Sequence, residues 1–219
     1  MNKTVKEIMK KKGPLSENEV KDFLNSYKIK TTKYKVVKKE EDLKNLNLKF
    51  PVALKVCSNK ILHKTDVGGV KLNIKDMNEL KKEFKRFRKK FSKENLLVDQ
   101  MEKKGVEIII GLARDPTFGL TIMVGVGGIY TELYKDVSFR VVPLVDEDSA
   151  IEMLDEVKGK KLLEGFRNIK ADKSQVIDLI MKVSKIGNEH MKKIDQMDLN
   201  PVFVYEKGYC VVDAKLILK

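Results

Sequence analysis

The sequence of 219 residues contains no tryptophan, two cysteines, two histidines and no long apolar run. A helix that spans a membrane needs about 20 consecutive apolar residues, so no segment is expected to cross a bilayer. The charged opening residues, MNKTVKEIMKKKGP, lack the apolar core of a secretory signal. Cys57 and Cys210 are far apart, each within an apolar strand-like run, which favours two buried free thiols over a disulfide. Together these absences predict a cytoplasmic protein.

Positive charge is abundant, with a formal net charge of +13. Much of it lies in LKKEFKRFRKKF, residues 80–91, where Leu80, Phe84, Phe87 and Phe91 recur at spacings of three and four. That spacing predicts an amphipathic helix whose aromatic rings face the core and whose cations face water. Nucleic-acid binding uses rings that are free to stack on bases. We therefore interpret the segment as a solvated helix and do not expect a nucleic-acid partner.

No repeat, low-complexity tract or Ser/Pro-rich linker interrupts the chain. Strand-like segments outnumber helical ones and often follow one another directly, which predicts an α+β fold rather than alternating α/β. Ser16 and Glu19 form a capping box for the first long helix. We expect helices at residues 17–26, 40–47, 77–90, 146–157 and 174–192. We expect strands at residues 34–38, 52–57, 70–74, 96–101, 106–113, 119–126 and 139–142, and a closing hairpin of residues 198–205 and 209–214.

The segment PVALKVCSNKILHKTDVGGVKLN, residues 51–73, combines three features suited to a polyphosphate. Lys55 interrupts an apolar strand, and a buried ammonium group needs an anion near its tip. Gly68 and Gly69 have no side chains, so their backbone N–H groups can approach phosphate oxygens. His63 lies on the loop between two strands, where an imidazole can accept and pass on a phosphoryl group. The alternatives are a lysine that extends to solvent from a strand end and an exposed loop histidine.

Two positions near the C-terminus are candidates for a divalent cation. DLNP, residues 198–201, and VDAK, residues 212–215, lie on adjacent strands of the expected hairpin, which brings Asn200 and Asp213 within reach of one ion. Oxygen ligands of this kind suit Mg²⁺, which keeps waters and bridges nucleotide phosphates. The alternative is structural, because Asn-Pro is a common turn dipeptide and Asp often ends strands.

Other positions carry weaker signals. Glu107 interrupts the apolar strand VEIIIGL and needs a cationic or hydroxyl partner, unless it lies on the wet face of an edge strand. The loop GVGG, residues 125–128, is typical of phosphate-binding loops, but it lacks the Gly-Lys-Ser/Thr of a P-loop. His190, in the polar stretch NEHMKK, is interpreted as structural or solvated.

HKTDVGGV, together with GVEIIIG, GVGGIYTELYKDVSFR, DLNP and VVDAK, resembles the ATP-grasp part of the ADP-forming acyl-CoA (acetate–CoA) synthetases. The chain is similar to their β subunit, a relative of the succinyl-CoA synthetase β chain, nearly from end to end. The resemblance implies a single ATP-grasp domain over residues 1–219. Its two α+β lobes, of about residues 14–100 and 101–219, would grip the nucleotide between them.

The same resemblance implies transfer of phosphate between a phosphohistidine and ADP or ATP, within the reaction acyl-CoA + ADP + phosphate ⇌ acid + CoA + ATP. His63 would carry the phosphoryl group, and Asn200 and Asp213 would bind Mg²⁺. Nothing in the chain looks like a CoA fold, so a separate α subunit would supply CoA binding and acyl transfer, usually in an α2β2 heterotetramer. The implied nucleotide-binding residues are Lys55, Gly68, Gly69, Gln100, Met101, Glu107, Gly127 and Gly128.

The sequence departs from the family pattern at the expected hinge. Family members commonly carry Gln-Glu-Met where this chain has Asp99-Gln100-Met101, so the resemblance leaves the ribose contact open, with Glu102 as an alternative to Gln100. Asp198 also stands where Glu is common. Asp66 can orient the imidazole or cap a turn. Arg140 can bind phosphate or the partner subunit, or form a structural salt bridge.

Two other functions fit parts of the sequence. A carboxylate–amine or carboxylate–thiol ligase of the same fold, acting through a free acyl phosphate, would not need His63. A basic nucleic-acid-binding protein on this fold would show salt-dependent affinity that does not depend on Lys55.

Overall fold

The computed structural model describes residues 3–61, 63–126, 135–144 and 146–219. The chain forms two compact units, a larger one of residues 1–13, 20–31 and 104–219 and a smaller one of residues 14–19 and 32–103. Residues 20–31, which the expected lobe boundary placed with the residues that follow them, group with the C-terminal residues instead. Backbone contacts join them to β10: Val211 donates its N–H to the Lys30 carbonyl at 2.9 Å, and Thr31 forms a β-bridge with Val211.

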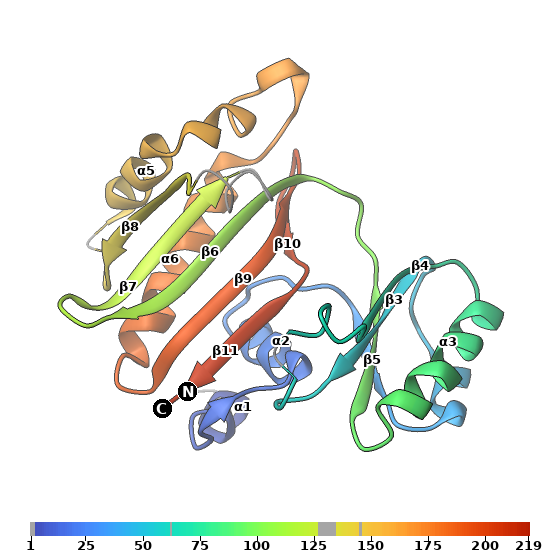
Figure 1. Ribbon diagram of the computed structural model, residues 1–219. Coiled ribbons are helices and arrows are strands. Elements are labelled where there is room, and N and C mark those ends of the chain that lie inside the picture. The colour runs from blue at the N-terminus through green and yellow to red at the C-terminus, as the bar shows by residue number, and fades with distance from the viewer. Residues whose placement is uncertain (1–2, 62, 127–134, 145) are drawn as a thin grey trace. The chain divides into compact units, whose positions relative to one another are not determined.

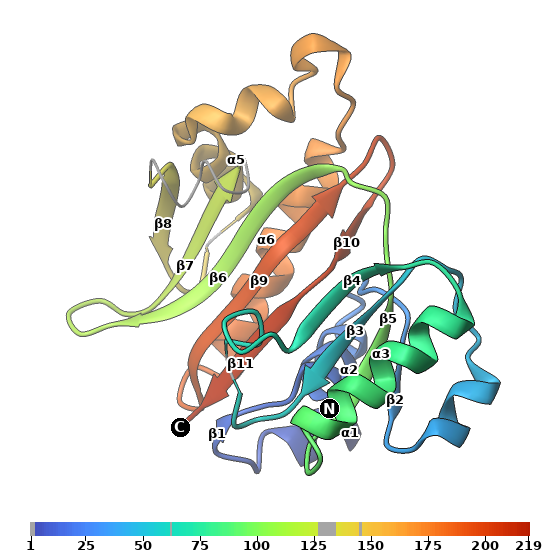
Figure 2. The same ribbon diagram turned by 45° about the vertical axis from the view of Figure 1, so that its right-hand side comes forward.

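The larger unit is built on a seven-stranded sheet of order β1-β11-β9-β6-β7-β8, with β10 also paired to β9 (Figure 1). Helices α5 and α6 cover one face of this sheet, as Figures 1 and 2 show. The strands are β1 (Gly13–Pro14), β6 (Val106–Asp115), β7 (Gly119–Val126), β8 (Val137–Val141), β9 (Ile194–Val204), β10 (Tyr209–Val211) and β11 (Ala214–Leu218). The helices are α1 (Lys3–Ile8), α2 (Glu17–Ser26, most of it in this unit), α5 (Glu147–Glu156) and α6 (Lys173–Glu189), with short 3-10 turns at Lys158–Leu162 and Phe166–Asn168.

Helix α6 packs on one face of this sheet and leaves the other face uncovered. Gly187 of α6 packs against Leu112 of β6, and a Cβ added at Gly187 would lie 3.2 Å from the Leu112 side chain. Successive strand residues point to opposite faces, so Gly111 belongs to the face that α6 leaves uncovered. Cross-strand pairing extends that face in a row of Lys215, Asp198, Gly111, Met123 and Phe139.

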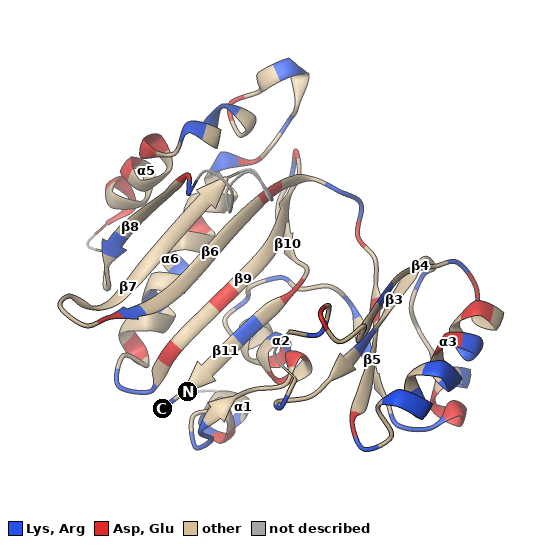
Figure 3. Ribbon diagram, viewed as in Figure 1, with Lys and Arg blue, Asp and Glu red and all other residues tan. Residues whose placement is uncertain are grey.

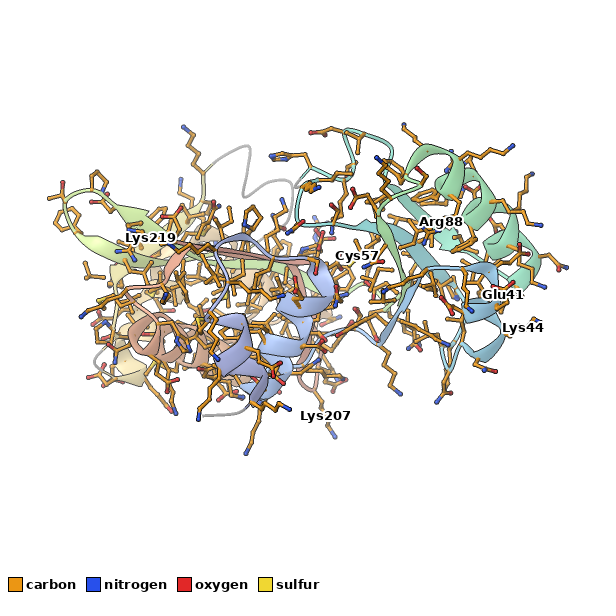
Figure 4. The ribbon with its side chains drawn as sticks, turned by 90° about the horizontal axis from the view of Figure 1, so that it is seen from below. Glu41, Lys44, Cys57, Arg88, Lys207 and Lys219 are labelled. Carbon is orange, nitrogen blue, oxygen red and sulfur yellow. The ribbon has the colours of Figure 1, made fainter. Side chains whose placement is uncertain are left out.

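The smaller unit is a four-stranded antiparallel sheet of order β2-β5-β3-β4 packed against α3. Leu80, Phe84 and Phe87 are buried as the spacing predicts, and most of the basic residues of α3, blue in Figure 3, are exposed. Burying each phenylalanine stabilises the unit by roughly 1.5–3 kcal/mol. Arg88 is an exception among the cations, because it donates to the carbonyls of Glu94 at 2.6 Å and Val37 at 3.1 Å (Figure 4). The elements are β2 (Tyr34–Val37), a 3-10 helix (Glu40–Asn45), β3 (Val52–Cys57), β4 (Val70–Ile74), α3 (Met77–Lys90) and β5 (Asn95–Gln100).

The C-terminal hairpin differs from the expected one. The sequence predicts two strands, but β9 is longer, and the returning chain divides into β10 and an additional strand, β11, both paired with β9. The division falls where Asn200-Pro201 faces Val212-Asp213, with Val212 donating to the Pro201 carbonyl at 3.0 Å. Proline has no N–H to donate, so the regular ladder cannot continue through this point.

Both cysteines are buried and free, as predicted, and Cys57 is marked in Figure 4. Within the described part of the chain, no helix is long and apolar enough to cross a membrane.

His190, at the C-terminal end of α6, is buried, with its Nε2 2.7 Å from the hydroxyl of Tyr27, which also donates to Glu189 at 2.7 Å. Burial lowers the pKa of His190, and the nearby Glu189 carboxylate only partly opposes this. The unfolded chain therefore binds a proton at this residue more readily than the folded chain does. Neutral His190 therefore contributes to the stability of the folded chain. This contribution is fully present above the ordinary pKa of 6.5 and is lost as the pH falls toward the lowered pKa.

We therefore expect the free energy of unfolding to decrease between about pH 7.5 and about pH 5.5, and to decrease less in His190→Gln. Denaturant unfolding at the two pH values measures both changes. An unaltered pH dependence in His190→Gln would assign the effect to other groups.

Candidate functional site

The candidate carrier, His63, lies on the loop of residues 58–69 that joins β3 to β4 (Figure 2). Its side chain is 75% exposed, and its Nδ1 lies 4.0 Å from a carboxylate oxygen of Asp66, which is equally exposed. An exposed imidazole on a loop can reach a reactant without disturbing a packed core. The 4.0 Å separation is too long for a direct hydrogen bond.

Gly68 and Gly69 close this loop. Gly68 donates its N–H to the Thr65 carbonyl at 2.9 Å, and Gly69 donates to the Lys64 carbonyl at 2.7 Å. Gly68 has a φ of +62°, and a Cβ at Gly69 would lie 2.9 Å from the Lys64 carbonyl oxygen. A side chain at Gly69 would therefore collide with the turn, and one at Gly68 would be strained by the positive φ. The two N–H groups expected to face phosphate are used within the loop here.

Lys55, on β3, is buried as predicted and has anions at its tip, but these are carboxylates of the protein. Its Nζ lies 2.7 Å from Glu17 Oε1 and 2.7 Å from Asp99 Oδ2. Lys64 donates to the other oxygen of Glu17, and all four side chains are buried. The hydroxyl of Thr32 donates to the second oxygen of Asp99 at 2.5 Å. We refer to Glu17, Lys55, Lys64 and Asp99 as the four-charge cluster, in which two formal positive charges balance two negative ones.

Sequence reasoning missed the partners of Lys55. One signal was available at Asp99, an acidic residue in the apolar strand NLLVDQ, since a buried carboxylate needs a partner just as a buried lysine does. Glu17 carried no such signal, because an acidic residue in the first turn of a helix is ordinary.

The two hinge candidates have partners within the smaller unit. The side-chain oxygen of Gln100 accepts a hydrogen bond from the Lys49 N–H at 3.0 Å. Met101 donates its N–H to the Pro51 carbonyl at 3.1 Å, and its sulfur lies 3.0 Å from the Asn73 nitrogen. Both side chains are half-buried and help to fix the end of β5.

Asn200 and Asp213 lie side by side at the interruption of the hairpin, as the sequence predicts. The Asn200 N–H donates to the Asp213 carbonyl at 3.1 Å, and both side chains are half-buried. Within the described residues, no group of three or more His, Cys, Asp or Glu side chains could hold a metal by itself. An amide and a carboxylate on neighbouring strands fit Mg²⁺, because that ion takes one or two protein ligands and completes its shell with waters and phosphates.

Glu107, on β6, lines a cavity of about 630 Å³ in the larger unit. Val106, Leu162, Ile169 and Val204 provide apolar walls, and the charged lining residues are Glu107, Lys104, Lys170 and Glu206. A volume of this size is typical of small-molecule sites.

The KDVSFR motif, residues 135–140, has structural partners. Arg140 binds both oxygens of Glu156, at 2.5 and 3.0 Å, and this guanidinium, followed by the Ser138 hydroxyl, lowers the pKa of Glu156 to about 2. The carboxylate of Asp136 accepts the N–H groups of Lys158 and Gly159 at 2.9 and 2.8 Å. The salt-bridge interpretation of Arg140 therefore has a partner in the structure. Gly127 and Gly128 lie outside the described residues.

Two antiparallel-sheet units, with a glycine-closed loop between β3 and β4 and an Asn/Asp pair near the end of the chain, define an ATP-grasp protein. The ATP-grasp domain model matches residues 7–218. The chain is 38% identical to the β subunit of ADP-forming acetate–CoA ligase I from Pyrococcus furiosus, over 94% of this chain and 92% of that subunit. It therefore belongs to the ATP-grasp family, among the β subunits of ADP-forming acetate–CoA ligases.

Two further relatives extend the comparison. ADP-forming acetate–CoA ligase II of Archaeoglobus fulgidus is 43% identical over 93% of this chain, which spans only 30% of that longer protein. A solved structure of the dinucleotide-forming acetyl-coenzyme A synthetase 1 of Ca. Korarchaeum cryptofilum matches with a TM-score of 0.81 and 42% identity. The match covers 94% of this chain and 93% of that one. That structure contains coenzyme A and Mg-AMPPCP, with its phosphohistidine segment pointing towards the nucleotide-binding site.

Proposed function

We propose that this chain is the nucleotide-binding subunit of an ADP-forming acyl-CoA synthetase, in which His63 carries phosphate to and from ADP. The observation that carries the proposal is His63 itself. It is exposed on the glycine-closed loop of an ATP-grasp domain, and relatives of that domain are named acetate–CoA ligase β subunits. The only other histidine of the chain, His190, is buried against Tyr27.

The proposed step is a nucleophilic displacement at phosphorus. In the direction of ATP synthesis, a terminal oxygen of ADP attacks the phosphoryl group on His63. An O–P bond forms as the N–P bond breaks, and the imidazole nitrogen keeps the bonding electron pair. The reverse step loads His63 from ATP. Such transfers depend mainly on positioning and on neutralisation of the phosphate charges.

Asn200 and Asp213 are the proposed ligands of Mg²⁺, which would neutralise charge on the nucleotide phosphates when bound. The proposed nucleotide contacts of the smaller unit are Lys55, Gly68, Gly69, Gln100 and Met101. Those of the larger unit are Glu107, Gly127 and Gly128. The cavity lined by Glu107 offers apolar walls for a base and lysines for anionic groups.

A separate α subunit would bind CoA and transfer the acyl group, giving a heterotetramer of two α and two β chains. The longer Archaeoglobus relative, of which this chain spans under a third, is consistent with such an additional part. The reaction uses free adenine nucleotides, and the two thiols are buried and unbridged, so we place the protein in the cytoplasm.

ADP binding tests the nucleotide half of the proposal. We expect the purified chain to bind ADP more tightly with Mg²⁺ than without it, and Asp213→Asn to reduce the affinity about tenfold or more only when Mg²⁺ is present. Titration calorimetry in the two conditions measures the difference. Asp195→Asn, on the same strand β9 but outside the proposed site, is the matched control. Equal affinities for Asp213→Asn and the native chain with Mg²⁺ present would remove Asp213 from the metal site.

A further inference from the structure

His63 and Lys64 are adjacent in sequence but lie in opposite environments. The His63 side chain is 75% exposed, whereas Lys64 is 8% exposed and its ammonium group is buried against Glu17. A lysine is rarely buried without a paired anion. The residue next to the proposed carrier is therefore held by an ion pair inside the protein, although it belongs to a surface loop.

Lys64 is held by its backbone as well as by its side chain. Its carbonyl accepts the N–H of Gly69 at 2.7 Å, and Gly69 in turn provides the carbonyl for the Val56 N–H of β3 at 2.8 Å. Through Lys64, the loop is thus attached to β3 and to Glu17 in the first turn of α2. His63 is the residue immediately before this attachment.

The charge balance of the four-charge cluster makes the attachment strong. Glu17 offers one oxygen to Lys55 and the other to Lys64, and Asp99 binds Lys55. If Lys64 leaves, the cluster changes from neutral to one net negative charge in a buried place. Coulombic interactions are strong where water is excluded, so departure of Lys64 is opposed.

From these contacts we infer that Lys64 is a positioning residue for His63. Its ion pair with Glu17 anchors the loop at residues 63–69, and His63 can move far from its observed place only when this pair separates. The expected effect on phosphate transfer rests on the proposed function. The anchoring of the loop by Lys64 does not depend on that function.

The best test is the charge-balanced double variant Glu17→Gln/Lys64→Met, because it removes the anchor and leaves Lys55 paired with Asp99. Lys64→Met alone would leave a buried charge and is compared only if it folds. Lys60→Met, an exposed lysine of the same loop, is the matched control. Lys64→Arg keeps the positive charge and should retain most of the native loop protection and phosphate transfer.

Two quantities are measured on the full chain. In the double variant we expect hydrogen exchange of the loop amides, including those of Gly68 and Gly69, to be at least about tenfold faster than in the native chain. We also expect transfer of labelled phosphate from Mg-ATP to His63 to be at least about tenfold slower, with the Kd for ADP changed less than about twofold. Lys60→Met should change neither.

Unchanged loop exchange in the double variant overturns the inference, whatever happens to transfer. Faster exchange with an unchanged transfer rate also overturns the positioning role. If the native chain itself takes no label on His63 while loop exchange responds as expected, the proposed function fails and the anchor stands.

Discussion

Lys55→Met is expected to lower the free energy of unfolding of the smaller unit by about 3–5 kcal/mol. The substitution keeps most of the apolar stem but removes the ammonium group that lies 2.7 Å from both Glu17 and Asp99. Glu17 retains Lys64, whereas Asp99 loses the lysine partner that balances its charge. A buried carboxylate that loses its counterion is among the few causes of destabilisation this large.

Denaturant unfolding followed by circular dichroism measures the effect, since the chain has no tryptophan to report on folding. Lys71→Met is the matched control, because Lys71 lies on the neighbouring strand β4, is half-buried and belongs to no such cluster; we expect a change within about 0.5 kcal/mol. Lys55→Met/Asp99→Asn removes one charge of each sign and should regain more than half of the loss. A single variant as stable as the native chain would show that the cluster is not held together by charge.

His63→Gln is expected to reduce acyl-CoA-dependent ATP formation by roughly a thousandfold or more, because removal of the nucleophile eliminates the covalent step. Glutamine is polar and of similar size, and His63 is exposed, so the fold and the affinity for ADP should be unchanged. Activity is measured with the α subunit present, because this chain alone is not expected to form or consume acyl-CoA.

Lys60→Met, on the same loop, serves as the control and should retain activity. A fully active His63→Gln variant would favour the rival ligase that uses a free acyl phosphate. Robust acyl-CoA turnover by the isolated native chain would contradict the division of labour between two subunits.

Much of the fold follows from local patterns. The spacing of Leu80, Phe84 and Phe87 predicts α3 with its observed bounds, and the apolar residues on both sides of Lys55 predict β3 as a buried strand. One half of the capping box is present, with Glu19 accepting the Ser16 N–H at 2.9 Å, while the Ser16 hydroxyl also donates to Glu19 at 2.6 Å. These features depend on neighbours in sequence, so a single sequence is sufficient to show them.

Features set by distant residues were not predictable in this way. The sequence shows that Lys55 needs an anion, but not that Glu17 and Asp99 provide it from 38 and 44 positions away. The grouping of residues 20–31 with the C-terminal part likewise depends on Thr31 and Val211 meeting in space. The division of the closing hairpin was visible in principle at Pro201, since proline cannot donate to the ladder.

The burial of Lys55 in the four-charge cluster affects how the nucleotide site can be tested. Lys55→Ala is an obvious probe of phosphate binding from the sequence alone, but the structure makes it first a probe of folding. Loss of ADP binding in that variant would not distinguish the two causes. Asp213 is half-buried at the hairpin interruption and is not a member of the four-charge cluster, so it provides a cleaner test of the nucleotide site.

The four-charge cluster also limits how this sequence can evolve. Its members lie at positions 17, 55, 64 and 99, and each single loss of charge leaves a buried imbalance. Substitutions at these four positions therefore depend on one another. A lineage that replaces one acidic member is under pressure to replace one basic member as well. Compensated pairs of substitutions, rather than isolated ones, are the changes that this part of the protein can accept.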